Sequence, residues 1–357
     1  MKPTLYIHCG IHKTGSSFLQ TMFVRNRDLL GSRGIHYPKS EKEFEMLNGE
    51  ITPGNGIHLA KALIQKEKVV ELLIHDLAEL RRMGLHSLLY SSETLFHAFA
   101  QNGAVSDFCS AAEDAGFDKI KALVYFRDPV SHILSTYKHR AKNGDHPDFK
   151  AWLHSNYETF DLIKAFLGYR NKYPIDWSCR KYSQESKHMI QSSFADWLST
   201  DLPDIPEDDR VNRSLKLSEI RILQELKNDF QGSEVFIREA LLSVDSSHKE
   251  SDRSISAELS KLAAEYLKEK ENLFKELNKF LRKDENLLIN SGKVHNPPKK
   301  DVGISLSLSQ MRAVAQGMKK YSDSQQPVNK IKDYWTRGVR KVKRKWVASR
   351  LNTSPVK

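Results

Sequence analysis

The stretch that decides the fold is LYIHCGIHKTGSSFLQ, residues 5–20, in which an apolar run leads into a polar turn and then into a helical pattern. The turn holds two glycines, one lysine (Lys13) and the hydroxyl side chains of Thr14, Ser16 and Ser17. Backbone N–H groups of such a turn and of a helix start converge on one point, where a cation completes a cradle for an anion. The stretch therefore predicts a strand, a phosphate-binding turn and a helix.

The position of the lysine separates this turn from the phosphate loop of kinases and ATPases. That loop reads G-x-x-x-x-G-K-[ST], with the lysine directly after the second glycine. Gly10 and Gly15 have the same separation here, but Ser16 occupies the lysine position and Lys13 lies two residues before Gly15. We expect a phosphate-binding turn in which the lysine lies before the second glycine instead of directly after it. An ordinary strand–turn–helix connection is the alternative, and the three hydroxyl groups argue against it.

Two segments, His8 to Gln20 and residues 121–137, together resemble motifs of the sulfotransferases, enzymes that use 3′-phosphoadenosine 5′-phosphosulfate (PAPS) as donor. The pattern H-x-G-x-H-K-T-G-S-S-x-L-Q, from His8 to Gln20, resembles their 5′-phosphosulfate loop. KALVYFRDPVSHILSTY, residues 121–137, resembles their 3′-phosphate motif, a strand, Arg-Asp-Pro and a helix with a serine eight residues after the arginine. The resemblance covers roughly residues 1–290 and implies a bacterial or carbohydrate-type enzyme with a P-loop-like fold.

The resemblance implies a role for each matching residue. Lys13 would stabilise charge on the bridging oxygen as its bond to sulfur breaks, and the residues after it would hold the 5′-phosphate. Arg127 ends an apolar strand, and its guanidinium offers the forked geometry that a phosphate prefers. An ion pair with a surface carboxylate is the structural alternative for this arginine. The expected cofactor-binding residues are Lys13, Thr14, Gly15, Ser16, Ser17, Arg127 and Ser135.

The acceptor must lose a proton in this reaction, so a general base is expected. Glu93 is the first candidate, because carbohydrate sulfotransferases that resemble this chain use a glutamate or a histidine. A glutamate in the first turn of a helix also favours the helix dipole, so a purely structural role stays open. His12, next to Lys13, is the second candidate and His97 the third. Sulfuryl transfer demands no metal, and no Cys/His ligand spacing appears, so we expect no metal site.

The rest of the chain predicts an α/β fold. Four predicted strands, at residues 4–9, 86–91, 119–126 and 175–182, alternate with helical patterns at 15–30, 69–83 and 105–115. This alternation predicts a three-layer parallel sheet with flanking helices. A mainly helical C-terminal extension follows, with helices at 215–230, at 259–280 and at 309–321, before a break at 322–327. Ligands of parallel sheets bind at the carboxyl ends of the strands, where the candidate segments His8–Ser17, Ser91–Glu93 and Arg127–Asp128 lie.

Charge divides the chain into a nearly neutral body and a basic tail. We expect an α/β domain over residues 1–290, a linker with a short helix over 291–327 and the tail over 328–357. The net charge is +11, and residues 329–357 contribute ten Lys/Arg and one Asp, or +9, which leaves +2 for the rest. Apolar residues recur in the tail at helical spacing, at Ile331, Trp335, Val339, Val342 and Trp346. A basic amphipathic helix suits an anionic membrane surface, although a disordered tail or a packed helix would fit too.

Composition limits the cellular location that we expect and the classes of protein that the chain can belong to. The 357 residues include three cysteines, no signal-peptide pattern and no apolar run of membrane-spanning length, so we expect a cytoplasmic enzyme. The tail would make it peripheral to the inner face of the membrane. We expect a carbohydrate hydroxyl of a surface polysaccharide or glycolipid as acceptor, and no nucleic acid. A P-loop kinase and a non-catalytic nucleotide-binding or membrane-scaffold protein are the alternatives, and the oligomeric state stays open.

Overall fold

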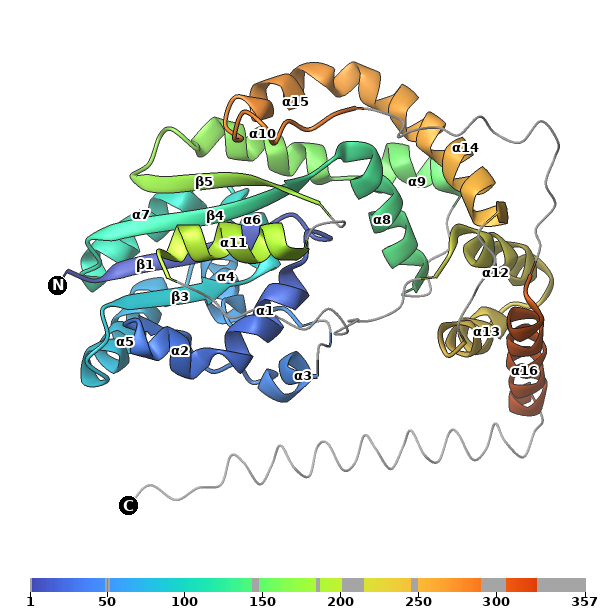
Figure 1. Cartoon of the computed structure of the whole chain (residues 1–357), viewed down its shortest axis with the longest axis horizontal. Helices are drawn as coiled ribbons and strands as arrows, with labels where there is room; N and C mark the ends of the chain where they lie inside the picture. The colour runs from blue at the N-terminus through green and yellow to red at the C-terminus, as the bar shows by residue number, and fades with distance from the viewer. Residues whose placement is uncertain are drawn as a thin grey trace. The chain divides into compact units, whose positions relative to one another are not determined.

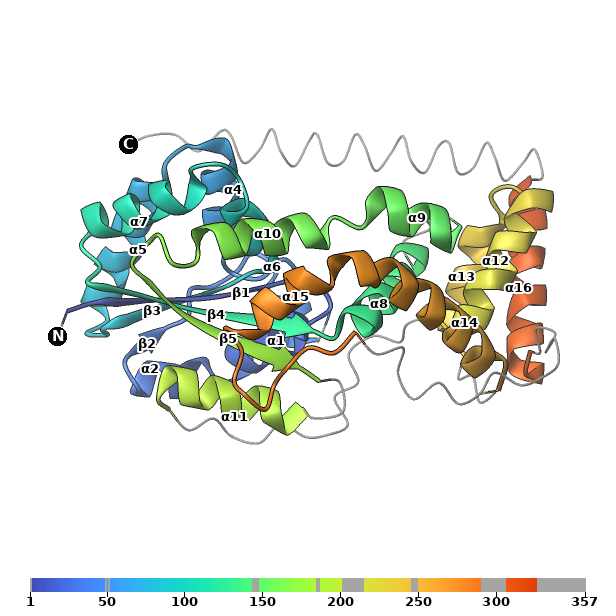
Figure 2. The same ribbon diagram turned by 90° about the horizontal axis from the view of Figure 1, so that it is seen from above.

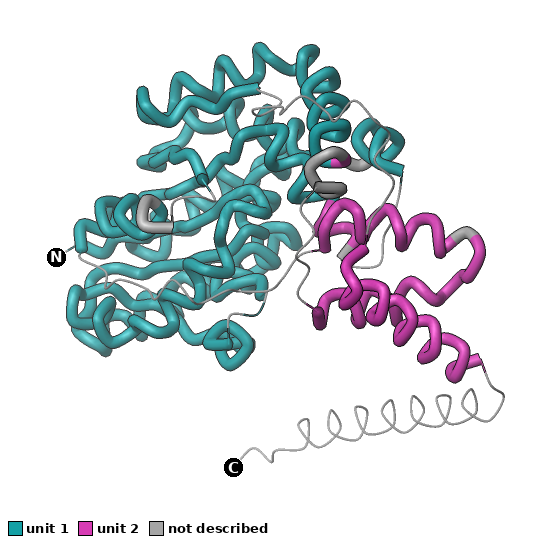
Figure 3. The backbone as a smooth tube through the Cα atoms, turned by 45° about the vertical axis from the view of Figure 1, so that its right-hand side comes forward, with its two compact units in different colours: residues 1–137, 148–213, 256–297 teal, residues 138–147, 214–255, 298–357 magenta. Residues whose placement is uncertain are grey.

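The computed structural model of the chain describes residues 2–48, 50, 52–142, 148–183, 187–200, 215–244, 250–289 and 306–325. The chain divides into two compact units (Figure 3). The first unit comprises residues 1–137, 148–213 and 256–297, and it contains the whole sheet. The second unit comprises residues 138–147, 214–255 and 298–357, and its described part is helical.

The first unit is built on a five-stranded parallel sheet with the strand order β2-β3-β1-β4-β5. In that order the strands are Ile35–His36, Ser87–Ser91, Thr4–Gly10, Lys119–Arg127 and Ile175–Tyr182. The central strands are buried along most of their length, because parallel strands need crossover helices that cover both faces. His8 pairs with Ser91 and Gly10 with Tyr125, so the carboxyl ends of β3, β1 and β4 meet at one edge. The predicted parallel α/β sheet is confirmed.

Helices lie on both faces of the sheet (Figures 1 and 2). Figure 2 shows α1 and α11 on one face and α4, α7 and α10 on the other. The helices of this unit are α1 (Ser16–Arg25), α2 (Arg27–Ser32), α3 (Glu43–Leu47), α4 (Ile57–Gln65), α5 (Val69–Arg82), α6 (Glu93–Phe99), α7 (Ala104–Ala115), α9 (Phe149–Asn156), α10 (Thr159–Tyr169), α11 (Lys187–Leu198) and α15 (Glu271–Asn278). Two more, α8 (Pro129–Lys142) and α14 (Glu250–Leu267), have residues in both units. No helix in the described ranges has both the length and the apolar character that crossing a bilayer requires.

Aromatic side chains pack both helical layers onto the sheet. On one face Phe23 of α1 lies 4.6 Å from Phe194 of α11, measured between ring centroids. On the other face Phe96 of α6 lies 6.1 Å from Phe126 of β4, which lies 5.5 Å from Phe166 of α10. Burying one such side chain contributes about 1.5–3 kcal/mol. This packing fixes the starts of α1 and α6, which carry candidate site residues.

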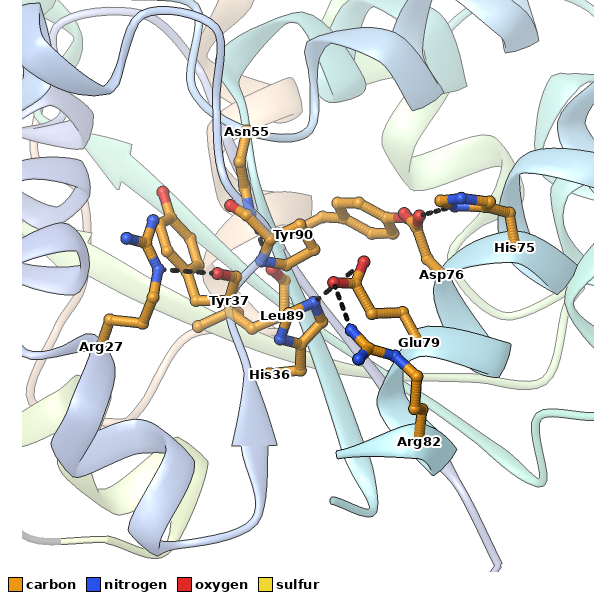
Figure 4. Close-up of polar contacts among 11 residues, drawn as sticks. Arg27, His36, Tyr37, Asn55, His75, Asp76, Glu79, Arg82, Leu89 and Tyr90 are labelled. Carbon is orange, nitrogen blue, oxygen red and sulfur yellow. Dashed lines mark hydrogen bonds and ion pairs between the residues drawn. The ribbon is translucent and has the colours of Figure 1, made fainter. Parts of the chain in front are cut away.

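A belt of polar contacts ties β2 and β3 to α5 (Figure 4). The hydroxyl group of the buried Tyr90 donates to Asp76, whose carboxylate also lies 2.9 Å from Nδ1 of His75. In the same view Glu79 lies between His36 and Arg82, at 4.0 Å and 3.8 Å. The Tyr90 hydroxyl is the buried group that needs its partner here, since an unpaired buried hydroxyl costs free energy. The belt therefore anchors β3, whose carboxyl end leads directly to Glu93.

Two of the predicted helices were wrong in that each is interrupted. The pattern at 15–30 breaks at Asn26, whose side-chain amide donates to the carbonyl oxygen of Met22 at 2.9 Å. Such competition with the backbone is typical of asparagine. The pattern at 259–280 breaks at a 3-10 turn, Lys268–Lys270, between α14 and α15. The apolar spacing continues across both breaks, which is why periodicity alone did not reveal them.

The second unit contains α12 (Leu217–Asp229), α13 (Ser233–Leu242) and α16 (Leu308–Gln325). A Cβ atom on Gly317 would lie 2.5 Å from the Cα atom of Ile237, so a glycine lets α16 approach α13 closely. The described residues 215–244 are grouped with α16 in this unit. The helix expected at 309–321 continues to Gln325, through part of the break expected at 322–327. Residues 290–305 and the basic tail over 328–357 lie outside the described residues.

Candidate active site

The turn after β1 has the backbone of an anion cradle. Lys13 and Gly15 both adopt positive φ angles, 69° and 82°, which is rare for a residue with a side chain. A Cβ atom on Gly15 would lie 2.8 Å from the ring of Tyr182. Both the positive φ angle and the space available therefore favour glycine at this position. Thr14 is buried, and its hydroxyl group donates to the carbonyl oxygen of Ile11 at 2.6 Å. Its side chain thus supports the turn from within.

The helix that follows begins without a side-chain cap. Gly15 is the N-cap residue of α1, and it has no side chain with which to accept from the first turn. The first N–H groups of a helix lack intrahelical partners and carry the positive end of the helix dipole. The start of α1 therefore has N–H groups without intrahelical partners, of the kind that suit an anion.

Side chains from β4 and α8 hold two consecutive carbonyl groups of the turn. Arg127, at the end of β4, donates from its guanidinium to the carbonyl oxygen of Lys13 at 3.2 Å. His132, in the first turn of α8, has Nε2 2.8 Å from the carbonyl oxygen of His12. A carbonyl oxygen only accepts, so Nε2 of His132 carries the hydrogen. The two contacts orient the peptide groups on either side of Lys13.

Glu93 approaches the turn from β3. The hydroxyl group of Ser16 donates to its carboxylate, and the backbone of Lys13 forms a further hydrogen bond with it. Burial raises the pKa of Glu93 above its ordinary value, while the Ser16 hydroxyl, the Lys13 ammonium and the Lys13 backbone oppose that shift. A partly buried carboxylate with a raised pKa is suited to act as a general base.

The backbone before Glu93 is fixed by an asparagine. The Asn55 side chain donates to the carbonyl oxygen of Leu89 at 3.0 Å and accepts from the N–H of Ser91 at 2.7 Å (Figure 4). The amide group thus hydrogen-bonds the edge of β3 as a neighbouring strand would. Ser92 then caps α6, with its hydroxyl oxygen 3.3 Å from the N–H of Thr94. Glu93 therefore begins α6 in a fixed position.

Three histidines gather beside the turn. The rings of His12 and His97 are stacked with centroids 6.3 Å apart, and those of His12 and His132 lie 5.1 Å apart. Nε2 of His12 lies 3.2 Å from the hydroxyl oxygen of Thr136 on α8. Burial lowers the pKa of His97, against the charge of Glu158, and lowers the pKa of His132 to about 4. At neutral pH His132 is therefore uncharged.

The guanidinium of Arg127 is partly buried and lies over the ring of Tyr182, with 5.5 Å between Cζ and the ring centroid. Burial lowers the pKa of Arg127, although an arginine keeps its charge at neutral pH. The next residue, Asp128, pairs with Lys181 at 2.9 Å and accepts from the N–H of Leu288 at 2.9 Å. Through Asp128 those contacts link the segment after α15 and the end of β5 to the residue that follows Arg127.

The structure brings together most of the residues that the sequence predicted. The turn itself contains His12 and Lys13 and leads into Ser16. Glu93 and Arg127 contact it from the neighbouring strands β3 and β4. Thr14 faces inward, Ser17 is partly buried on α1, and Ser135 is partly buried two turns into α8. In this structure the Ser16 hydroxyl is directed at Glu93, a partner that sequence reasoning did not foresee. No group of three or more His, Cys, Asp or Glu side chains in the described residues could hold a metal ion.

Sequence reasoning missed His132, Tyr157 and Asn55. His132 follows Arg127 by five residues and shares a helix face with Ser135, so its helical spacing could have marked it. Tyr157 and Asn55 lie in stretches without a recognisable pattern. Their contacts cross 25 and 36 residues of chain, and only the fold reveals them.

Comparisons with known proteins add little to this geometry. No family model matches the chain, and no curated protein matches it. A solved structure described as a sulfotransferase from Alicyclobacillus acidocaldarius is similar at 17% identity and a TM-score of 0.32, covering 69% of this chain and 97% of its own. A likeness at this level supports no assignment. The functional conclusion rests on the chain's own residues.

Proposed function

We propose that this chain is a PAPS-dependent sulfotransferase that transfers the sulfuryl group to a hydroxyl group, most simply that of a carbohydrate. The observation that carries the proposal is the turn with the displaced lysine, held between a partly buried carboxylate and a guanidinium. Glu93 reaches the turn through Ser16, and Arg127 reaches it through the Lys13 carbonyl group. The turn after β1 supplies the cation and the N–H donors, β3 leads to the candidate base, and β4 ends in the guanidinium. In-line group transfer depends on positioned groups of this kind.

The donor would bind across the turn and β4. The N–H groups at the start of α1, with Thr14, Gly15, Ser16 and Ser17, would hold the 5′-phosphate. Lys13 would lie at the bridging oxygen and stabilise the charge that develops there. Arg127 and Ser135 would hold the 3′-phosphate. The Arg127 guanidinium has five N–H donors, so one bond to the turn is compatible with a second role.

The chemistry needs one proton acceptor. The acceptor oxygen attacks sulfur, the bond from sulfur to the bridging phosphate oxygen breaks, and adenosine 3′,5′-bisphosphate leaves. The proton of the acceptor hydroxyl passes to the Glu93 carboxylate, whose raised pKa suits it to that task. His12 and His97 are the alternative bases, since their stacked rings lie beside the same turn.

The acceptor and the cellular setting are proposals from the sequence alone. A carbohydrate hydroxyl follows from the resemblance of the two motifs to carbohydrate sulfotransferases. Contact of the basic tail with an anionic membrane would suit a surface polysaccharide or glycolipid acceptor at the inner face of the membrane. Flotation with anionic liposomes would test this, with a chain ending at Pro327 as the control.

Calorimetry on the full chain tests the donor. We expect binding of adenosine 3′,5′-bisphosphate without metal, and weaker or no binding of ATP with Mg²⁺. Preference for ATP with Mg²⁺ would identify a kinase-like protein and overturn the proposal. Binding of neither nucleotide would favour a non-catalytic scaffold.

A further inference from the structure

A buried hydrogen-bond chain reaches the turn from α8 and from the residues just before α10. The hydroxyl oxygen of Tyr157, just before α10, lies 2.5 Å from Nδ1 of His132. Nε2 of the same ring lies 2.8 Å from the carbonyl oxygen of His12. Because Nε2 must donate to that carbonyl, a neutral ring has its lone pair on Nδ1, and the Tyr157 hydroxyl donates to it. The hydrogen bonds therefore run in one direction: Tyr157 donates to His132, and His132 donates to the carbonyl group of His12.

The chemistry of the two side chains keeps this direction fixed near neutral pH. Burial lowers the pKa of His132 to about 4, helped by the charges of Arg127 and Lys13 and opposed by the His12 carbonyl group. Burial also raises the pKa of Tyr157, so the phenol keeps its proton. Neither group changes charge between pH 6 and pH 8, and the contact with His12 persists.

The peptide group that joins His12 and Lys13 is held on both sides. Its oxygen accepts from His132, and the backbone of Lys13 is hydrogen-bonded to Glu93. The next carbonyl group accepts from Arg127, and Lys13 between them has a positive φ angle. An unusual backbone conformation persists only where its surroundings determine it. These contacts hold Lys13 in that conformation.

His132 is buried in largely apolar surroundings. His132 is 1% exposed and lines a small cavity with Tyr157 and the largely apolar side chains of Ile11, Phe126 and Ile163. A buried imidazole costs desolvation unless both nitrogens have partners, and here both do. The buried His8 is different, since its Nε2 has no partner among the described residues. Satisfaction at both nitrogens indicates that the orientation of His132 matters.

We infer that His132 and Tyr157 are positioning residues that orient the His12–Lys13 peptide group, and through it align the anion cradle with the Glu93 carboxylate. The alignment of cradle and base rests on the proposed function. The hydrogen-bond chain does not, so the two can fail separately. Neither side chain is placed in contact with PAPS or with the acceptor substrate.

Amide hydrogen exchange on the ligand-free full chain tests the inference directly. Tyr157→Phe removes one hydroxyl group, and we expect the amides of residues 13–17 to exchange about five times faster, the effect of one net hydrogen bond. Tyr169→Phe is the matched control, because its buried hydroxyl has no partner among the described residues. Equal exchange in the two variants would overturn the inference.

Two substitutions of His132 separate positioning from packing. His132→Gln keeps an N–H donor that can reach the His12 carbonyl, whereas His132→Leu keeps only volume. We expect Gln to restore most of the protection of residues 13–17 that Leu loses. Equal loss in both would overturn the inference. If His132→Leu does not fold, the tyrosine pair still decides the outcome.

Nucleotide binding by the same variants links the inference to function. We expect Tyr157→Phe to weaken the binding of adenosine 3′,5′-bisphosphate about fivefold and Tyr169→Phe to leave it unchanged. If Tyr157→Phe bound the bisphosphate as tightly as the natural protein, alignment of the cradle by these hydrogen bonds would be excluded. If the natural chain bound no bisphosphate, the proposed function would fail, while hydrogen exchange would still decide the positioning role.

Discussion

The hydroxyl group of Ser16 donates a hydrogen bond to the carboxylate of Glu93, 77 residues further along the chain. One residue begins the helix after β1 and the other begins the helix after β3. Adjacent parallel strands bring the two helix starts together, since His8 pairs with Ser91. The contact couples the anion cradle to the candidate base, and several predictions depend on it.

Ser16→Ala should change the pH dependence of the reaction. The hydroxyl group lowers the pKa of Glu93, which burial raises, so its loss raises that pKa further. A base works only when ionised, so the rate falls as the pH drops through its pKa. We expect the acidic limb of the pH–rate profile to move to higher pH. An unchanged limb would show that Glu93 does not govern it. Ser32→Ala, on the exposed side of α2, is the control.

Glu93→Gln should abolish most of the activity while leaving donor binding intact. Loss of a general base lowers rates about 10²–10⁴-fold. The neutral amide keeps the shape of the carboxyl group and removes a negative charge beside the cradle. We therefore expect bisphosphate binding to be as tight as before or tighter. Full activity in this variant would transfer the role of base to His12 or His97, to be tested by His12→Asn and His97→Asn.

The same substitution should stabilise the fold at neutral pH. Burial disfavours the ionised form of Glu93, so its folded pKa lies above its unfolded pKa. The stability from the protonated group is complete below the unfolded pKa and is lost as pH rises through the folded pKa. Thermal unfolding should show Glu93→Gln more stable than the natural chain at pH 7 and equal to it near pH 4. Glu113→Gln, at an exposed site of α7, should show no such difference.

Lys13→Ala should slow the chemical step with little effect on stability. An interaction made with a developing charge is worth about 2.7–4 kcal/mol, or a 10²–10³-fold change in rate. Lys66→Ala is the matched control, because Lys66 is exposed and also has a positive φ angle, 55°. Single-turnover kinetics with PAPS would measure the step. A rate within a few-fold of the control would remove Lys13 from the mechanism.

Asn55→Ala should lower both stability and turnover. The substitution leaves the carbonyl group of Leu89 and the N–H of Ser91 without their buried partner, at a cost of about 1–3 kcal/mol each. The end of β3 then loosens, and Glu93 loses its fixed position. Calorimetric unfolding and turnover would measure the two effects. Asn102→Ala, in an exposed turn, should change neither, and a stable but inactive Asn55 variant would indicate a direct role in the site.

Part of this architecture follows from local sequence. The four long strands and the turn with Lys13 carry strong apolar and glycine signals, so their places were predictable. β2, with two residues, is too short for a pattern, and the breaks at Asn26 and Lys268 preserve the apolar spacing. The contacts of His132 with His12 and of Asn55 with β3 depend on which strands become neighbours. No spacing in the sequence encodes that order.

The contact between Arg127 and the Lys13 carbonyl leaves two roles to separate, one in shaping the turn and one in binding the 3′-phosphate. Loss of either role weakens donor binding, but only the second depends on the 3′-phosphate. A cycle of two proteins and two ligands therefore distinguishes them.

Calorimetry of the natural chain and Arg127→Met with adenosine 3′,5′-bisphosphate and with adenosine 5′-monophosphate is the most direct measurement. We predict that the natural chain binds the bisphosphate more tightly and that Arg127→Met abolishes this preference, while Lys13→Ala retains it. An equal loss for both ligands in Arg127→Met, or no preference in the natural chain, would contradict a donor held between Lys13 and Arg127.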